Sequence, residues 1–209
     1  MVGRIIKTEA CVAEGAAWLA EQDPKLRQAL DITGPLPTRL RKDGFDQLLS
    51  AIVSQQVSVA AARAIWKRMQ DAKLTGPRKV MWATEDELRA VGLSRQKVRY
   101  AKALAEARID FKALRDTPNE EIVKTLTQVS GIGVWTAEIY AMFSLGRADV
   151  FAPGDLALQE SARILFQLNK RPTEKELRIM AEAWSPWRSV AARLLWAYYH
   201  VEKQREGIT

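Results

Sequence analysis

The sequence predicts an all-α protein, and three observations support this fold class. Strict alternation of apolar and polar residues, which is typical of half-buried strands, is almost absent. Alanine, the residue with the highest helix propensity, is abundant throughout the chain. Helix-start signals recur at short intervals, and they indicate about nine or ten helices joined by short turns.

The first helices lie on either side of a clear break. Glu9 and Glu14 interrupt the apolar residues near the N-terminus, so this segment is typical of an amphipathic helix and not of a signal peptide. Gly-Pro-Leu-Pro at 34–37 then breaks the chain. Two cap residues follow, each with its expected helix: Asp43 before 45–56 and Ser58 before 59–70.

Capping boxes mark several later helices, because a threonine and a glutamate three residues on can each bond to the other's backbone. The boxes are Thr84 with Glu87, Thr117 with Glu120 and Thr173 with Glu176. Ser94 caps a helix over 95–107, and Pro118 occupies the first position of a helix over 118–128. The last expected helices cover 134–145, a segment that starts after Asp155, and 187–204.

We expect the helices to form two lobes. Residues 35–145 form a continuous block of helices, and residues 1–34 together with 146–209 form the second lobe. The two lobes make up a single unit over 1–209. A cleft between them would lie near the glycine turn at 130–133 and Asp155.

Composition and charge favour a folded protein with a polyanionic partner. Hydrophobic residues make up 47% of the 209 residues, so a core can form. The net charge is +7 and the pI about 9.6. A solvated basic surface without a partner has the same composition, so charge alone does not decide between these interpretations.

Cysteine and histidine are too scarce for several kinds of site. Cys11 is the one cysteine and His200 the one histidine, so they supply no internal disulfide, zinc site or iron–sulfur cluster. We therefore expect no cofactor, and we expect a reducing, intracellular compartment. No apolar run approaches the ~18 residues that a membrane span needs.

Ser130-Gly131-Ile132-Gly133 is the most informative turn of the chain. Glycine adopts backbone conformations that other residues avoid and lets a ligand approach the main chain. We expect the amides of Gly131 and Gly133 to face an anion, helped by the positive end of the helix that begins at Val134. Ile132 should be buried in the core. A tight turn with no ligand has the same pattern.

Backbone carbonyls around this turn can also bind a cation. Those of Thr127, Val129 and Ile132 can converge on a monovalent ion that bridges to a bound phosphate.

The chain resembles the helix-hairpin-helix/Gly-Pro-Asp DNA glycosylase superfamily, whose signature is that hairpin, a Gly/Pro-rich loop and a catalytic aspartate. The resemblance lies in LTQVSGIGVWTAEIYAMF at 126–143 and ADVFAPGD at 148–155. Other segments are similar to the 3-methyladenine DNA glycosylase II type: FDQLLSAIVSQQVSVAAARAIWKRM, VGLSRQKVRYAKALA and WSPWRSVAARLLWAYYH. Together they cover about residues 40–200, in the order that the family has them.

This resemblance implies a two-lobed helical glycosylase fold with an interlobe cleft, a single catalytic unit and double-stranded DNA with damaged bases as partner. Relatives that also cut the DNA backbone carry a lysine two residues after the second hairpin glycine, where this chain has Trp135. Without that amine no Schiff base forms, so the expected enzyme has no lyase activity. Branches of the family with an iron–sulfur cluster need four cysteines, which this chain lacks.

Asp155, 22 residues after Gly133, is the expected catalytic residue. Hydrolysis of an N-glycosidic bond builds positive charge on the deoxyribose, which a nearby carboxylate stabilises while it orients or deprotonates water. N3- or N7-alkylated purines already carry positive charge, so they leave with little protonation. Asp155 can also cap the helix after it, and the two roles can coexist. Asp149 is a weaker candidate, expected to cap or pair at the surface.

Aromatic residues are the candidates for the base pocket. Three tryptophans among aliphatic residues are expected in the core: Trp18, Trp66 and Trp82. Trp135 follows the hairpin directly, and its indole can favour a flipped cationic base by roughly 0.5–2 kcal/mol. Trp196 matches a pocket tryptophan of the family, and Tyr199 is a further candidate wall. For Trp196, core packing is the alternative.

A base must flip out of the duplex before its N-glycosidic bond can be hydrolysed, and a protein side chain must fill the space that it leaves. The turn 54–58 matches the family's intercalating loop, so we expect Gln56 to be the plug, with Val57 and Ser58 beside it on the DNA. A plain turn with Ser58 as helix cap is the alternative. Lys97 and Arg99 can reach phosphates near the lesion, although such charges are most often solvated surface.

The expected function is hydrolysis of the N-glycosidic bond of alkylated purines, of the 3-methyladenine type, in base excision repair. Two alternatives remain: a glycosylase for uracil or mismatched bases, and a helix-hairpin-helix protein that binds DNA without catalysis. We expect a monomer that lies with the DNA, in the cytoplasm or, in a eukaryote, in the nucleus.

Overall fold

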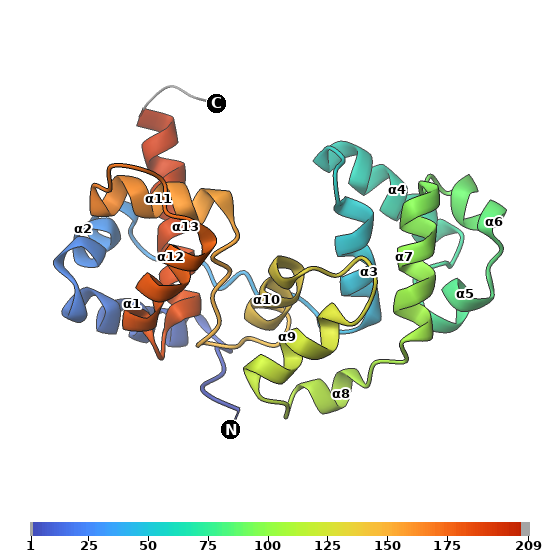
Figure 1. Cartoon of the computed structure of the whole chain (residues 1–209), viewed down its shortest axis with the longest axis horizontal. Coiled ribbons are helices and arrows are strands. Elements are labelled where there is room, and N and C mark those ends of the chain that lie inside the picture. The colour runs from blue at the N-terminus through green and yellow to red at the C-terminus, as the bar shows by residue number, and fades with distance from the viewer. Residues whose placement is uncertain (1, 206–209) are drawn as a thin grey trace. The chain divides into compact units, whose positions relative to one another are not determined.

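The computed structural model describes residues 2–205, which form helices joined by short loops (Figure 1). Within this range lie thirteen α-helices, one 3-10 helix and an isolated bridge between Ile5 and Arg147. The predicted all-α fold class is therefore confirmed. The helices exceed the expected number because several are shorter than two turns, too short for a periodic pattern to be recognised.

The chain divides into two compact units, which are described separately. Unit 1 is Met1–Leu40 with Ala141–Thr209, and unit 2 is Arg41–Tyr140. The boundaries of unit 2 lie a few residues inside the 35–145 lobe expected from the sequence. Unit 2 contains α3 (Phe45–Ser54), α4 (Val59–Asp71), α5 (Pro77–Trp82), α6 (Glu85–Ala90), α7 (Arg95–Glu106), α8 (Phe111–Leu114), α9 (Asn119–Thr127) and most of α10 (Val134–Phe143). Unit 1 contains α1 (Glu9–Gln22), α2 (Pro24–Thr33), α11 (Leu156–Phe166), α12 (Glu174–Met180), the 3-10 helix Ala181–Trp184 and α13 (Arg188–Arg205).

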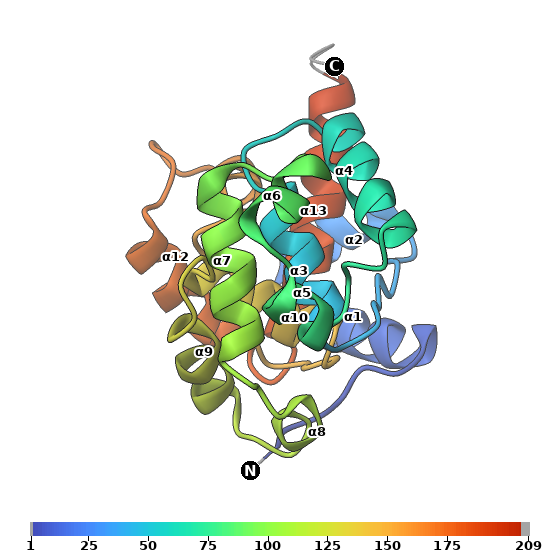
Figure 2. The ribbon, with the colours of Figure 1, turned by 90° about the vertical axis from the view of Figure 1, so that its right-hand side faces the viewer.

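The core of unit 2 forms where α7 packs against α3, α5 and α6 (Figure 2). Leu48, Leu49 and Ile52 of α3 and Leu104 of α7 are at most 1% exposed. Burial of each such side chain stabilises the fold by roughly 1.5–3 kcal/mol relative to an exposed position. The helix from which the candidate intercalating loop departs, α3, is therefore held by a well-packed core.

Most of the expected helix starts are confirmed. The Ser58 hydroxyl accepts from the Ala61 amide at 3.2 Å, and the Ser94 hydroxyl accepts from the Lys97 amide at 3.3 Å. Two capping boxes form as predicted: Thr84 with Glu87 before α6, and Thr173 with Glu176 before α12.

Two expected caps are wrong, because each side chain has a different partner. Asp43 does not cap α3, which begins after Gly44. Instead its carboxylate accepts from Arg115 at 2.7 and 3.0 Å. The Thr117 hydroxyl does not cap α9 but donates to the Ala113 carbonyl at 2.8 Å. Pro118 is the N-cap of α9, whereas it was expected at the first position inside the helix.

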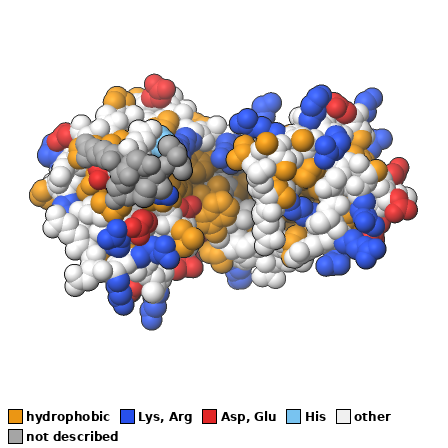
Figure 3. Space-filling model, turned by 90° about the horizontal axis from the view of Figure 1, so that it is seen from above, with side chains coloured by type: hydrophobic (Ala, Val, Ile, Leu, Met, Phe, Trp, Pro, Cys, Tyr) orange, Lys and Arg blue, Asp and Glu red, His pale blue; other side chains and the backbone are white. Residues whose placement is uncertain are grey.

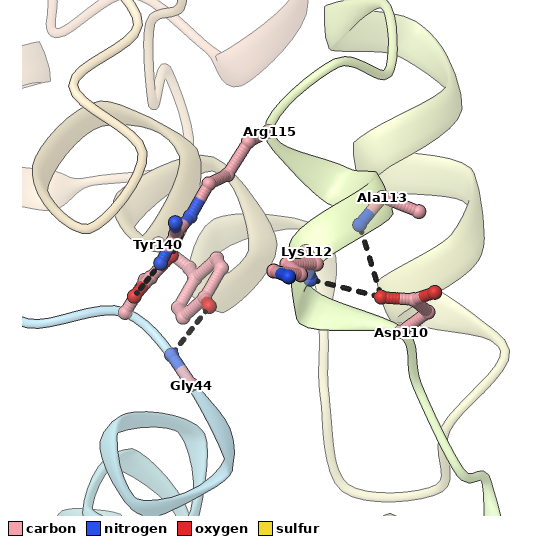
Figure 4. A network of polar contacts seen from close by, with 7 residues as sticks. Gly44, Asp110, Lys112, Ala113, Arg115 and Tyr140 are labelled. Atoms are coloured by element: carbon pink, nitrogen blue, oxygen red, sulfur yellow. Dashed lines mark hydrogen bonds and ion pairs between the residues drawn. The ribbon is translucent and has the colours of Figure 1, made fainter.

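The contact made by Arg115 belongs to a polar cluster before α3 (Figure 4). There the Gly44 amide donates to the Tyr140 hydroxyl at 2.9 Å, and the Tyr140 ring lies 6.3 Å from that of Phe111. Burial raises the pKa of Tyr140 to about 12, so this phenol stays protonated and accepts the bond at neutral pH. The cluster fixes the entry to α3.

In unit 1, α13 packs against α1, α2 and α11 around a buried arginine. Arg193 is 1% exposed, and its guanidinium donates to the Thr38 carbonyl at 2.7 and 3.0 Å and to the Ser189 carbonyl at 2.8 Å. Burial lowers its pKa to about 10. The arginine also lies 4.7 Å from the centroid of the Phe143 ring. It therefore fixes one face of α13 from within the core.

The three tryptophans expected in the core differ in burial. Trp18 and Trp66 are half-buried, but Trp82 is 81% exposed, so its expected core position is wrong. Val80 is the buried residue of the short helix α5, which leaves the indole at the helix end in solvent. No helix among residues 2–205 has the length and apolarity that a membrane crossing requires.

Candidate functional site

The glycine turn between α9 and α10 depends on Gly131. Its φ is +95°, in the left-handed region that favours glycine, and a Cβ built there would lie 2.4 Å from Cγ of Tyr100. Tyr100 was not recognised from the sequence as part of this turn. The Ile132 amide donates to the Val129 carbonyl at 3.0 Å, and this bond closes the turn.

The side chains around the turn divide into a buried and an exposed group. Ile132 is 4% exposed, as predicted for the residue that anchors the turn in the core. Gly133 is exposed, and a Cβ built on it would meet no atom within 4 Å. Val134 and Trp135 are 44% and 46% exposed at the start of α10. The turn therefore presents main chain, a helix N-terminus and an indole to solvent.

The candidate intercalating loop connects α3 with α4 in the same unit. Gln56 is exposed and has φ +54°, an uncommon conformation for a residue with a side chain. Val57 is 39% exposed, and Ser58 is exposed while it caps α4. A strained, exposed loop of this kind is typical of a functional segment.

A hydrogen bond that the sequence did not predict connects this loop to the glycine turn. The Gln55 side-chain amide donates to the Gly131 carbonyl at 2.9 Å, across 76 residues of sequence. Both segments line one cavity of about 590 Å³, together with Ser94, Gln96 and Tyr100 of the α7 region. Unit 2 thus brings the predicted plug and the predicted phosphate-binding turn to one place.

Lys97 was expected at the surface as a phosphate contact, but its side chain is largely buried. It is 9% exposed, and its ammonium donates to the Val53 carbonyl at 2.6 Å. Burial lowers its pKa. Because Val53 lies in the last turn of α3, Lys97 holds the end of the helix from which the loop departs. Its side chain also borders the cavity that the loop and the glycine turn line, and a phosphate contact of Lys97 stays a prediction.

Asp155 stands at the start of α11 in unit 1, and three donors hold its carboxylate. Its Oδ1 atom accepts from the amides of Ala157 at 2.9 Å and Leu158 at 3.1 Å, which confirms the predicted helix cap. It also accepts from the indole Nε1 of Trp196 at 3.2 Å. The half-buried carboxylate is thereby held in one orientation.

Trp196 therefore contacts the candidate catalytic residue directly. From the sequence it was expected as a wall of the base pocket, and this hydrogen bond to Asp155 was not predicted. The centroid of its ring lies 5.7 Å from that of the Phe143 ring. Tyr199, one turn later on α13, is half-buried, and the Lys203 ammonium lies 5.1 Å from its ring centroid.

The loop before Asp155 is fixed by its own bonds. The Asp155 amide donates to the Ala152 carbonyl at 3.0 Å, and the buried Gln159 side chain donates to the Pro153 carbonyl at 2.8 Å. Asp149 accepts from Arg188 at 2.6 and 3.0 Å, the kind of pairing that was expected for it. Asp149 is thus engaged in an ion pair, whereas Asp155 caps a helix.

The polar groups at the candidate site residues include a carboxylate, indole N–H groups and the main chain. Among residues 2–205 no group of three or more histidines, cysteines, aspartates or glutamates is placed to hold a metal ion. A cation at the carbonyls of Thr127, Val129 and Ile132 stays a prediction.

Comparison with known proteins identifies the family. Residues 49–189 match the HhH-GPD superfamily of base excision DNA repair proteins. The chain belongs to this superfamily. DNA-3-methyladenine glycosylase 1 of Schizosaccharomyces pombe is 34% identical to this HhH-GPD protein over 165 residues, which make up 75% of the chain and 72% of that relative.

Two solved HhH-GPD structures are similar over nearly the whole chain. A DNA-3-methyladenine glycosidase from Bacillus halodurans has a TM-score of 0.82 and 32% identity, over 96% of this chain and 94% of that one. The 3-methyladenine DNA glycosylase of S. pombe in complex with abasic DNA has a TM-score of 0.76 and 30% identity, over 88% of this chain and 95% of that one. The HhH-GPD match includes both the glycine turn and Asp155.

Proposed function

We propose that this HhH-GPD protein is a monofunctional DNA glycosylase that hydrolyses the N-glycosidic bond of alkylated purines, of the 3-methyladenine type, in base excision repair. The observation that carries the proposal is the Asp155 carboxylate, held by two backbone amides and the Trp196 indole at the start of α11. The names of its relatives support an alkylated purine as the substrate.

Each segment of the site has a place in this reaction. The amides of Gly131 and Gly133 and the N-terminus of α10 bind a phosphate of the damaged strand. Gln56 fills the space that the flipped nucleotide leaves in the duplex. The deoxyribose of that nucleotide lies beside Asp155, whose carboxylate stabilises the positive charge on the sugar as the base departs and orients the attacking water.

The exposed aromatic residues suit a cationic base. Trp135 is 46% exposed at the start of α10, and its indole face attracts a positively charged ring. Because residue 135 is not a lysine, no amine is present there to form a Schiff base with the sugar, and the product is an intact strand with an abasic site. Lysine and arginine side chains are frequent on the face drawn in Figure 3, and the net charge of +7 suits DNA as partner. We propose that the protein acts where the chromosomal DNA lies, in the cytoplasm or nucleus.

Incubation with methylated duplex DNA tests this function. We expect chromatography to show release of 3-methyladenine, and the strand should remain intact on a denaturing gel until alkali is added. Nicking by the pure protein would contradict the monofunctional assignment. Release from uracil-containing DNA alone would favour a different glycosylase, and binding without release of any base would favour a DNA-binding protein without catalysis.

Gln55→Leu tests the connection between the loop and the turn. Leucine keeps a similar volume but removes the donor to the Gly131 carbonyl, at a cost of about 1 kcal/mol in loop positioning. We expect base release from duplex DNA to fall about five-fold at that cost, and release from single-stranded DNA to change less, because no gap needs filling there. An equal loss on both substrates would argue against a role of Gln55 in the duplex step.

A further inference from the structure

The exposed indole of Trp82 lies at a fixed place on unit 2. It is 81% exposed, yet the backbone on both sides of it is held, because the Lys102 ammonium donates to the Met81 carbonyl at 2.7 Å and to the Ala83 carbonyl. Lys102 itself lies on α7, which packs against α5. The large apolar side chain is therefore presented to solvent by a fixed segment of the core.

Trp82 borders a cavity of about 500 Å³, large enough for one or two side chains. The apolar residues that line it include Phe45, Met81, Leu104 and Phe111. The charged residues among its lining are Arg78 and Arg108, both exposed, and no acidic residue is part of the lining. The site thus combines an apolar floor with a positive rim.

The cavity lies at one end of α3 and α7, and the candidate DNA-binding segments lie at the other end of these helices. Phe45 is the first residue of α3 and Leu104 lies near the end of α7, whereas the intercalating loop follows the end of α3 and Lys97 lies near the start of α7. A ten-residue helix such as α3 is about 15 Å long. A duplex seated on the loop and the glycine turn therefore leaves the cavity to a different partner.

We propose that this cavity, which we call the Trp82 pocket, is a docking site for an acidic peptide segment of a partner protein that carries one apolar side chain. The apolar side chain enters between Trp82 and Phe111, and carboxylates on either side of it pair with Arg78 and Arg108. Tryptophan and arginine are the residues that most often dominate the energy of protein interfaces. Charge complementarity selects an acidic segment, since the rim carries positive charge only.

Titration with short acidic peptides tests the proposal. The panel carries a single leucine, methionine, phenylalanine or tryptophan in each peptide, with a serine version and a lysine-rich version as controls. In a ¹H–¹⁵N spectrum of the indole groups, the Trp82 signal is assigned by its loss in Trp82→Phe. We expect at least one acidic peptide with an apolar side chain to shift that signal, and expect no shift from either control. Methylated duplex DNA should shift Trp135 and leave Trp82 unchanged.

Variants of exposed residues complete the test. We expect Trp82→Ala to weaken binding of the peptide about 30-fold and Arg78→Glu with Arg108→Glu to weaken it at least about five-fold. For Trp82→Ala, the melting temperature and base release from methylated DNA should remain as in the wild type, since this change keeps the net charge and Trp82 lies outside the proposed site. Failure of the whole panel to bind would overturn the proposal, as would equal binding by Trp82→Ala. A DNA affinity that falls in Trp82→Ala would assign the pocket to DNA, and a dimer that Trp82→Ala dissociates would assign it to a second copy of the chain.

Discussion

Asp155→Asn is expected to lower the rate of base release by about 10³-fold while folding and DNA binding remain close to those of the wild type. Asparagine caps helices about as well as aspartate, and its amide oxygen can accept from the same backbone amides and from Trp196. What the variant loses is the negative charge that stabilises the cationic sugar. Removal of one such electrostatic contact from an active site lowers the rate by about 10²–10³-fold, and we expect a loss at the upper end of this range.

Single-turnover release from methylated duplex DNA measures this loss, with the melting temperature and DNA affinity measured in parallel. Asp149→Asn is the matched control, because Asp149 lies in the same loop but pairs with Arg188. We expect this control to keep its rate within a few-fold of the wild type. Retained turnover in Asp155→Asn, or an equal loss in both variants, would show that the carboxylate of Asp155 is not the catalytic group.

Gly131→Ala should damage both the fold and DNA binding. The substitution places a side chain at φ +95° and a Cβ 2.4 Å from Cγ of Tyr100, so either the turn or the tyrosine must move. Strain of this kind costs about 1–3 kcal/mol. For a protein of this size, that lowers the melting temperature by about 2–12 °C. The Gly131 carbonyl would shift with the turn, so the bond from Gln55 should weaken as well.

Gly133→Ala separates phosphate binding from stability. At this position φ lies outside the left-handed region, and the added Cβ meets no atom of the protein within 4 Å. We therefore expect a wild-type melting temperature together with weaker DNA binding, because the methyl group would stand where the phosphate approaches. Unchanged DNA affinity in Gly133→Ala would contradict the proposed place of the phosphate.

The sequence was sufficient for features that depend on neighbouring residues. Caps at Ser58, Ser94 and Asp155 involve amides two or three residues away, and each formed as predicted. Burial of Ile132 likewise follows from its place between two glycines in a turn. The helical fold class rested on many such local signals that agree with one another.

Features that depend on distant residues could not be predicted in this way. The bond from Gln55 to Gly131 and the pair of Arg115 with Asp43 join residues 76 and 72 positions apart. Local signals carry no information about such partners. The Thr117 box failed for a related reason, since the hydroxyl had a nearer acceptor in the preceding turn at Ala113.

Two side chains were misplaced although the sequence held part of the information. Lys97 lies four and seven residues before Ala101 and Leu104, so it shares the buried face of α7, but its charge favoured a surface position. Trp82 ends a helix of six residues, which is too short for spacing to define a buried face. Its place among aliphatic residues indicated the core.

The proposed reaction is tested most directly by a crystal structure of the wild-type protein with duplex DNA. The DNA contains a positively charged, uncleavable abasic-site analogue. We predict that the amides of Gly131 and Gly133 bind a phosphate next to the analogue, and that the Asp155 carboxylate contacts its cationic ring. Gln56 should occupy the gap in the duplex. A complex in which the glycine turn binds DNA while Asp155 faces away from the analogue would contradict the proposed function.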